Sequence, residues 1–235
     1  VGQSKLQEPS IAASNDVMAP HFLVDPFWPK PLPNHWAMGN TIGVDVDERD
    51  HIFIVHRNDA SQFGGNTEIG LQGGVAECCT PAPPIIEIDI EGNIINAWGG
   101  PVEGAPYTWP ASNHGIEIAP NGDVWIGGNG GGDSHVLVFT RDGEYIRTIG
   151  MQGEDRDSNS QTHYGRVAEI AIDVEANEAY FADGYQNKRV AVVDVSTGAF
   201  KRYWGAYGNR PDDTADVTYT PGQPGPQQFR GPVHC

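Results

Sequence analysis

The chain has 235 residues, in which 14 lysines and arginines face 31 aspartates and glutamates, for a formal net charge of −17. This balance argues against a nucleic-acid partner or an anionic membrane, because both attract clustered cations, while a metal or a cationic ligand stays compatible with it. No apolar run is long enough to span a membrane, and no basic and apolar leader precedes the first domain, so Val1 is expected to be a mature or trimmed end.

The chain begins with a segment, residues 1–39, that we expect to be an N-terminal extended arm. Its later part, around His21–Asn40, is rich in proline, tryptophan and phenylalanine. We expect this part to pack across a ring of strands or to supply the strand that closes the ring. Residues 40–235 are expected to form the main domain.

Alternating apolar residues predict strands throughout the main domain, and helical periodicity is absent, so the fold class is all-β. Three inner strands are predicted at Ile42–Val46, His114–Ile118 and Ala168–Ile172. Second strands are predicted at Ile52–Val55, Val124–Ile126 and Ala179–Ala182. Further strands flank turn glycines, as at Val136–Phe139 and Tyr145–Ile149.

Three turn glycines, Gly92, Gly143 and Gly198, each precede an apolar–glycine pair whose glycine lies seven residues later. The turn glycines are 51 and 55 residues apart. Such a repeat in an all-β chain is typical of propeller blades, which stack around an axis because one small sheet cannot bury both of its faces. The sequence therefore predicts three β-propeller blades.

The first blade carries an inserted loop at about residues 58–84, which is rich in glycine and holds Cys78 and Cys79. Long structured loops on a propeller face often shape a binding site. Adjacent cysteines can form a vicinal disulfide, or each can pair elsewhere. The third cysteine, Cys235, is expected to pair with chain that is absent here. Disulfides would indicate an oxidising setting, so we expect a secreted or periplasmic protein.

The last eight residues, 228–235, look like the entry of a fourth inner strand, so the chain would supply about three and a fraction blades. Three blades alone would leave open sheet edges. Either the chain is part of a protein of about twice this length, which we prefer, or a second copy completes the ring.

Two histidines, His114 and His234, occupy the same repeat position at the entry of an inner strand, 120 residues apart. That separation equals two blades; blade 3, between them, carries Ala168 at this position, and blade 1 carries Ile42. Imidazoles on alternate blades would converge near the propeller axis. With a third equivalent histidine, three neutral imidazoles and an open position would suit a catalytic zinc.

The segment Asp183–Val190, followed by Tyr203-Trp204-Gly205, resembles the blade motif of NHL-repeat proteins, which are six-bladed β-propellers. Among these it is most similar to the peptidyl-α-hydroxyglycine α-amidating lyases. Three further segments resemble that family in the same order: Ile54–Asp59, Asn113–Ile116 and Pro232–His234. The resemblance covers residues 40 to 235 in patches.

The resemblance implies a zinc-dependent lyase that cleaves peptidyl-α-hydroxyglycine to a peptide amide and glyoxylate. His114 and His234 would be zinc ligands, with the third histidine beyond Cys235. Tyr185 would be the catalytic phenol that takes the proton of the substrate hydroxyl. Arg57 would hold the substrate carboxylate, a role that suits a planar guanidinium.

The same resemblance implies a structural calcium in the channel, bound by the backbone carbonyls of Val44 and Ile116. Two features depart from the family. The family has a disulfide-bonded cysteine directly after the tyrosine, where this chain has Gln186, and the inserted loop with Cys78 and Cys79 is absent from the animal pattern.

Two other functions stay open, since one propeller scaffold can carry different reactions. The first is a non-catalytic extracellular binding or scaffold module with a structural channel metal. The second is a metal-dependent hydrolase of the lactonase type, which would need carboxylate ligands on the inner strands. Glu117 and Glu169 lie on inner strands, but at registers that are not equivalent. For the lyase, the expected partner is a small-molecule or peptide substrate.

Overall fold

The computed structural model describes residues 20–59, 79–153, 157–231 and 233–234. Across these ranges the secondary structure is β-strand apart from one short 3₁₀ helix, η2 (Ala206–Gly208), so the all-β prediction is confirmed. No helix in the described ranges is long and apolar enough to cross a membrane.

Twelve of the strands form three four-stranded antiparallel sheets, each a meander in chain order. The first sheet consists of β2 (Asn40–Val46), β3 (Ile52–Arg57), β5 (Ile85–Ile88) and β6 (Ile94–Trp98). The second consists of β7 (Asn113–Ile118), β8 (Val124–Gly128), β9 (His135–Phe139) and β10 (Tyr145–Gly150). The third consists of β11 (Val167–Asp173), β12 (Glu178–Asp183), β13 (Arg189–Asp194) and β14 (Phe200–Trp204).

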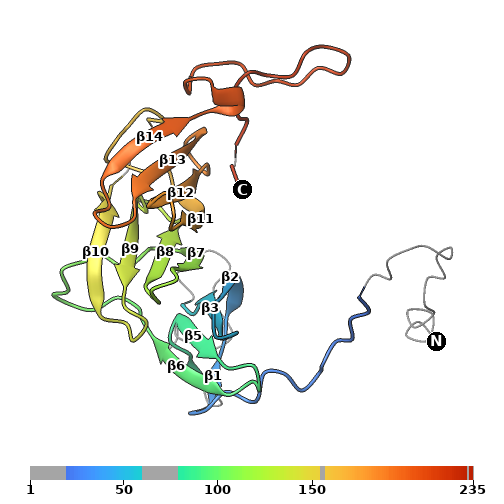
Figure 1. Ribbon diagram of the computed structural model, residues 1–235, viewed down its shortest axis with the longest axis vertical. Coiled ribbons are helices and arrows are strands. Elements are labelled where there is room, and N and C mark those ends of the chain that lie inside the picture. Colours follow the sequence, from blue (N-terminus) through green and yellow to red (C-terminus); the bar gives the residue numbers. More distant parts are fainter. Residues whose placement is uncertain (1–19, 60–78, 154–156, 232, 235) are drawn as a thin grey trace.

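The three sheets lie side by side along an arc, as propeller blades do (Figure 1). The first strands, β2, β7 and β11, line the concave side, where β7 contacts both β2 and β11, while β6, β10 and β14 lie on the outside. The prediction of part of a β-propeller with three blades is therefore confirmed. The described residues at 228–231 and 233–234, where a fourth inner strand was expected to begin, are not in strand conformation.

The blades are held together by apolar side chains between neighbouring sheets. Phe53 and Val55 of β3 pack against blade 2, whereas Ile54 between them faces the opposite side, as period-2 alternation requires. In the same way Trp125 of blade 2 and Phe181 of blade 3 belong to one buried cluster. Both faces of blade 2 are thus covered by neighbouring blades. This explains why the sequences of its strands are nearly continuous runs of apolar residues.

The turn glycines of the repeat allow each blade to pack on the preceding one. A Cβ atom on Gly143 would lie 2.7 Å from Trp98 Cδ2 of blade 1, and one on Gly198 would lie 2.9 Å from Ile149 Cγ1 of blade 2. In each case the apolar residue of the apolar–glycine pair in one blade packs against the turn glycine of the next blade. This contact is the physical origin of the spacing in the sequence.

The N-terminal arm occupies the position of a preceding blade against blade 1. A Cβ atom on Gly92 would lie 3.1 Å from Trp28 Cδ1, so Trp28 takes the place that Trp98 has at Gly143. Further arm residues pack on the free face of the blade 1 sheet: Leu32, Trp36 and Met38. The two-residue strand β1 (Trp36–Ala37) pairs in parallel with β4 (Thr80–Pro81).

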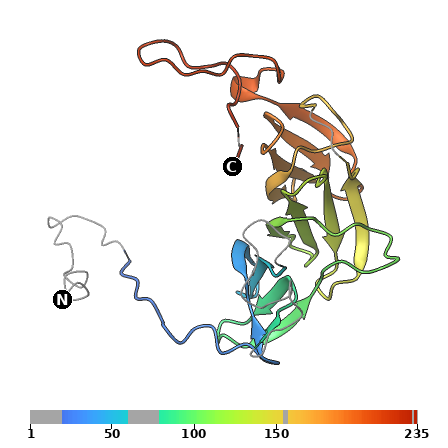
Figure 2. The ribbon, with the colours of Figure 1, turned by 180° about the vertical axis from the view of Figure 1, so that it is seen from behind.

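Before Trp28 the arm leaves the sheets, and residues 20–27 run away from the blades when seen from either side (Figures 1 and 2). Phe22, Leu23, Val24 and Phe27 are correspondingly exposed. Residues 1–19 and 60–78, which include Cys78 and most of the inserted loop, lie outside the described residues, as does Cys235. The pairing of the cysteines stays a prediction.

Candidate active site at the entry of the inner strands

Each inner strand contains one extra residue near its start, where its pairing with the second strand shifts in register. The shifts fall between Thr41 and Gly43, Asn113 and Ile116, and Val167 and Ile170. A β-bulge of this kind turns a side chain away from the regular alternation. His114 lies in the bulge of β7. The bulge therefore sets the direction of its imidazole, and the regular alternation of a β-strand does not predict it.

His114 is 7% exposed and both of its ring nitrogens have partners. Nδ1 lies 2.8 Å from the carbonyl oxygen of Ala168, and Nε2 lies 2.8 Å from the hydroxyl oxygen of Tyr185. Because a carbonyl can only accept, Nδ1 carries the hydrogen, and Nε2 accepts from the Tyr185 hydroxyl with its lone pair.

Burial lowers the pKa of His114 below its ordinary value, and the charges of Arg57 and His234 act in the same direction. The imidazole is therefore neutral at physiological pH. A neutral ring that donates its other N–H to a backbone carbonyl is the form in which histidine binds metals.

His114, Tyr185 and His234 form a triangle of rings. The ring centroids are 5.1 Å apart for His114 and Tyr185, 5.3 Å for Tyr185 and His234, and 5.8 Å for the two histidines. Two imidazoles bound to one tetrahedral zinc, with Zn–N near 2 Å, have ring centres roughly 5 Å apart. The spacing of the two histidines is thus close to that of two ligands of one ion, although no group of three or more His, Cys, Asp or Glu within the described ranges is arranged to hold a metal.

His234 reaches this triangle because the C-terminal segment passes over the end of β12. A Cβ atom on Gly184 would collide with the backbone nitrogen of Val233, and Val233 is itself buried. Glycine at position 184 is therefore needed for the close approach that sets His234 beside Tyr185.

A fully buried ion pair holds the loop that carries Tyr185. Asp183 accepts hydrogen bonds from Arg189 Nε at 2.6 Å, from Asn187 Nδ2 at 3.0 Å and from the backbone N–H of Gly165. Arg189 also donates to the carbonyls of the preceding loop, including that of His163. Tyr185 thus sits between two fixed ends of a short loop between β12 and β13.

Arg57, the last residue of β3, is 5% exposed. Its Nε donates to the carbonyl of Asn113 at 3.3 Å and its Nη2 to Oδ1 of Asn129 at 3.1 Å. Its charge interacts with both Tyr185 and His114. Arg57 therefore braces the bulge of β7 and belongs to the same cluster as the three rings.

A cavity of about 470 Å³ opens beside Tyr185. It is lined by Ala111, Ser112, Asn129, Gly130, Gly131, Arg166 and Tyr185. Three of these residues, Ser112, Asn129 and Arg166, were not among the residues predicted to form a site. The glycine-rich segment 127–132 was the sequence feature that could have indicated this cavity, since glycines permit the tight loop that forms one of its walls.

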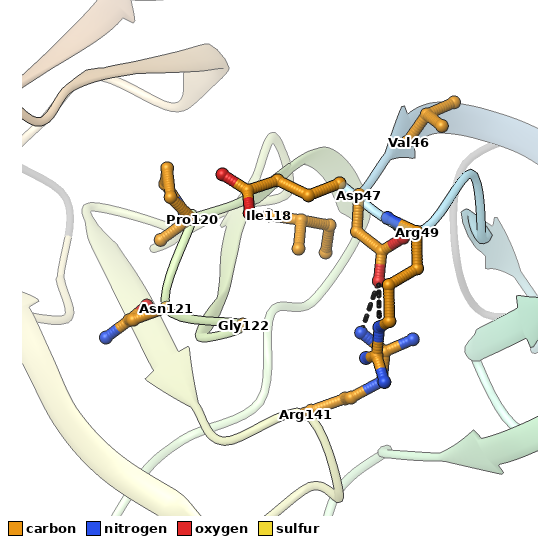
Figure 3. A pocket seen from close by; sticks show the side chains of 10 residues that line it. Val46, Asp47, Arg49, Ile118, Pro120, Asn121, Gly122 and Arg141 are labelled. Atoms are coloured by element: carbon orange, nitrogen blue, oxygen red, sulfur yellow. Dashed lines mark hydrogen bonds and ion pairs between the residues drawn. The ribbon is translucent and has the colours of Figure 1, made fainter.

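Another cavity, of about 400 Å³, lies at the opposite ends of β2 and β7, and its lining includes Asp47, Arg49, Asn121 and Arg141. Figure 3 shows Asp47 between the two arginines, with its carboxylate paired to both. The Asp47 carboxylate is thus paired with two cations. The other acid of the lining, Glu48, has no histidine or tyrosine beside it among the lining residues, so this cavity lacks a pair comparable with His114 and Tyr185.

No family model matches the chain. A probable peptidyl-α-hydroxyglycine α-amidating lyase of Caenorhabditis elegans is 25% identical over 165 residues, which are 67% of this chain and 42% of that protein. The chain is a distant homologue of an amidating lyase. It spans about two fifths of the length of that curated relative.

Solved structures similar to the chain include U3-55K, at 13% identity and a TM-score of 0.47, covering 73% of this chain and 41% of that one. They also include the hydrazine synthase of Kuenenia stuttgartiensis, at 11% identity and a TM-score of 0.45, covering 74% and 38%. A third is an inactive virginiamycin B lyase of Staphylococcus aureus with quinupristin, at 16% identity and a TM-score of 0.43, covering 76% and 45%.

Of the six residues that resemblance to the amidating lyases singled out, the structure brings four together: His114, His234, Tyr185 and Arg57. The other two, Val44 and Ile116, lie further along β2 and β7, opposite Ile54 and Ile126. They occupy equivalent registers on neighbouring inner strands. The roles of all six stay predictions.

Proposed function

We propose that this chain supplies the catalytic site of a zinc-dependent lyase that converts an α-hydroxyglycine compound to an amide and glyoxylate. One observation carries the proposal: the lone pair of His114 Nε2 and the hydroxyl of Tyr185 lie 2.8 Å apart, with the ring of His234 beside both. Distant homology to an amidating lyase supports the choice of reaction.

His114 and His234 are the residues that would hold the zinc, because this metal favours imidazole nitrogens. The donor set fits, since His114 is neutral and tethered to the Ala168 carbonyl through its other nitrogen. Bound there, zinc would supply the positive charge that polarises the substrate hydroxyl. The carbonyls of Val44 and Ile116 are proposed to bind a structural calcium, which favours oxygen ligands.

In this proposal Tyr185 reacts as the phenolate, after its own hydroxyl proton has left, and takes the proton of the substrate hydroxyl. The electrons of that O–H bond form the carbonyl of glyoxylate as the C–N bond breaks, and the departing nitrogen takes up a proton to give the amide. Tyr185 can return the proton that it took, so no proton is gained or lost overall. Arg57 holds the substrate carboxylate and so fixes the reacting carbon beside the phenol.

The complete enzyme is proposed to be a six-bladed NHL-type propeller in an oxidising compartment, secreted or periplasmic. Further blades would close the ring and supply the remaining metal ligand, either from additional chain or from a second copy. The inner strands support this arrangement, because β2, β7 and β11 lie in order along the concave side of the arc.

The test is glyoxylate release from N-benzoyl-α-hydroxyglycine by the intact zinc-loaded protein. Tyr185→Phe is expected to lower the rate about 100-fold, the usual loss when an acid–base group is removed, while zinc content stays unchanged. The exposed Tyr207 provides a matched control, since Tyr207→Phe should keep the full rate.

Bound zinc without glyoxylate release in the unmodified protein would refute the lyase proposal. The non-catalytic binding or scaffold module would then be the better assignment, and Tyr185→Phe should leave partner binding intact.

A further inference from the structure

The cavity beside Tyr185 has the composition of an anion-binding subsite. Its one ionisable side chain besides Tyr185 is that of Arg166, and no carboxylate is among the residues that line it. This is unusual in a chain with a formal charge of −17. The cavity volume of about 470 Å³ leaves room for a short chain of atoms extending from the reacting centre.

Ser112 is another residue that lines this cavity, and its hydroxyl is buried. The residue is 3% exposed, and its Oγ has no hydrogen-bond partner among the described residues. A buried hydroxyl without a partner costs free energy that a bound acceptor can recover. The unpartnered Oγ is therefore a second and independent sign that a polar group binds here.

The backbone around Ser112 is held by hydrogen bonds to the Asp133 carboxylate. Asp133 accepts the backbone N–H of Ala111 at 2.8 Å, of Ser112 at 3.1 Å and of Gly130 at 2.7 Å. Three N–H donors satisfy this buried carboxylate, and it ties the two walls of the cavity together.

Arg166 is held in an uncommon conformation at the entry of β11. Its φ of +66° lies in the left-handed region, which a long side chain seldom adopts. With the Gln186 amide oxygen turned toward it, Arg166 donates to that oxygen from Nε at 3.1 Å and from Nη2 at 2.9 Å. The guanidinium is thereby tied to the residue that follows Tyr185. Backbone strain of this kind is concentrated at binding and active sites.

We infer that Arg166 and Ser112 form a subsite for a second carboxylate of the substrate, carried on the acyl group attached to the hydroxyglycine nitrogen. The inference rests on the proposed function, because it assumes that the first carboxylate is held by Arg57. The preferred substrate is then a dianion, such as an α-hydroxyglycine whose acyl group or preceding residue is acidic. Arg166 is a specificity-determining residue, since it contacts the acyl end and not the reacting bond.

Binding can be tested without turnover by titrating the intact zinc-loaded protein with N-succinylglycine and N-butanoylglycine. These ligands lack the reactive hydroxyl and differ by one carboxylate. The unmodified protein is expected to bind N-succinylglycine about tenfold more tightly, as one charge-assisted hydrogen-bonded pair provides. Arg166→Gln is expected to abolish this preference and leave binding of N-butanoylglycine unchanged, and Ser112→Ala to reduce the preference.

Arg49→Gln is the matched control, because it removes the same charge from a mostly exposed side chain at the opposite ends of the inner strands. It should keep the tenfold preference. Thermal unfolding of each variant establishes that it is folded. Equal binding of the two ligands by the unmodified protein, no binding of either, or an unchanged preference in Arg166→Gln would overturn the inference.

Turnover of the corresponding N-succinyl and N-butanoyl α-hydroxyglycines separates the two proposals. Glyoxylate release without a preference for the succinyl compound would reject the subsite and keep the lyase. A binding preference that Arg166→Gln abolishes, without glyoxylate from either compound, would keep the subsite and reject the lyase.

Discussion

His114 Nε2 and the Tyr185 hydroxyl oxygen are 2.8 Å apart although 71 residues separate them in the chain. His114 begins blade 2 and Tyr185 follows the second strand of blade 3, so the pair spans the boundary between two blades. The Ala168 carbonyl, also from blade 3, fixes the other imidazole nitrogen. The stacking of blades 2 and 3 therefore orients the lone pair of His114 Nε2 toward the hydroxyl of Tyr185.

The first prediction concerns zinc affinity. His114→Ala and His234→Ala should each weaken zinc binding at least 100-fold, because each removes a proposed nitrogen ligand, whereas Tyr185→Phe should leave it nearly unchanged. Competition with a chromogenic chelator measures the affinity. The exposed arm residue His21 offers a control, and His21→Ala should behave as the unmodified protein does. Equal affinity in His114→Ala and the unmodified protein would exclude His114 as a ligand.

The second prediction concerns the ion pair that holds the Tyr185 loop. Asp183 and Arg189 are both fully buried, so Asp183→Ala should leave a buried guanidinium without its partner and cost about 3–5 kcal/mol of stability. Chemical denaturation measures this loss. Arg202→Gln is the comparison, because Arg202 is about half-exposed and Lys201 still pairs with Glu178. That variant should lose less than about 1 kcal/mol. Similar losses in the two variants would contradict the structural role given to Asp183.

Much of the fold was predictable from the sequence because blades repeat. The alternating apolar residues placed all three inner strands within two residues of their observed bounds, since each blade buries the same positions. The repeat alignment also gave His114 and His234 equivalent positions, and their rings do converge, at 5.8 Å.

The remainder depends on contacts that no local pattern encodes. The left-handed backbone of Arg166 and the buried hydroxyl of Ser112 arise where two loops of different blades meet. Gln186 stands where the resemblance to the amidating lyases implies a disulfide-bonded cysteine, and its amide oxygen, when turned toward Arg166, accepts from that guanidinium instead. The contact between Trp28 and Gly92 was equally unpredictable from the sequence, because the N-terminal arm does not contain the blade repeat.

The third prediction tests the contact that sets the repeat spacing. Gly143→Ala should destabilise the protein for two reasons: alanine is strained at a φ of +87°, and its Cβ would meet Trp98 at 2.7 Å. Gly122 has a similar φ of +90° but no atom within 4 Å of a built Cβ, so Gly122→Ala carries the strain alone. We expect a loss of about 1 kcal/mol for Gly122→Ala and about 1–3 kcal/mol more for Gly143→Ala. Equal losses by thermal unfolding would mean that the Trp98 contact does not restrict this position.

The fourth prediction concerns the carboxylate of Glu117 on an inner strand. Glu117 on β7 accepts the backbone N–H of Ile172 on β11 at 3.1 Å. Burial, together with the negative charges of Asp45 and Glu169, raises the pKa of Glu117 to about 7. The folded protein therefore holds this proton more tightly than the unfolded chain does, and folding is favoured most below the unfolded value near 4.5.

Stability should consequently fall as the pH rises from about 4.5 to 7 and stay at the lower level above that range. Because solvent screens this partly exposed carboxylate, we expect a total change of about 2 kcal/mol, less than the pKa difference alone would give. Glu117→Gln keeps the acceptor for Ile172 but removes the charge, so this variant should be more stable than the unmodified protein at pH 8 and equally stable at pH 4.5. Urea unfolding in the presence of a chelator gives both values without a channel cation. The exposed Glu103 is the control, and Glu103→Gln should follow the unmodified curve. Parallel curves of stability against pH for Glu117→Gln and the unmodified protein would contradict this prediction. They would show that the folded protein stabilises the charged Glu117 carboxylate as well as water does.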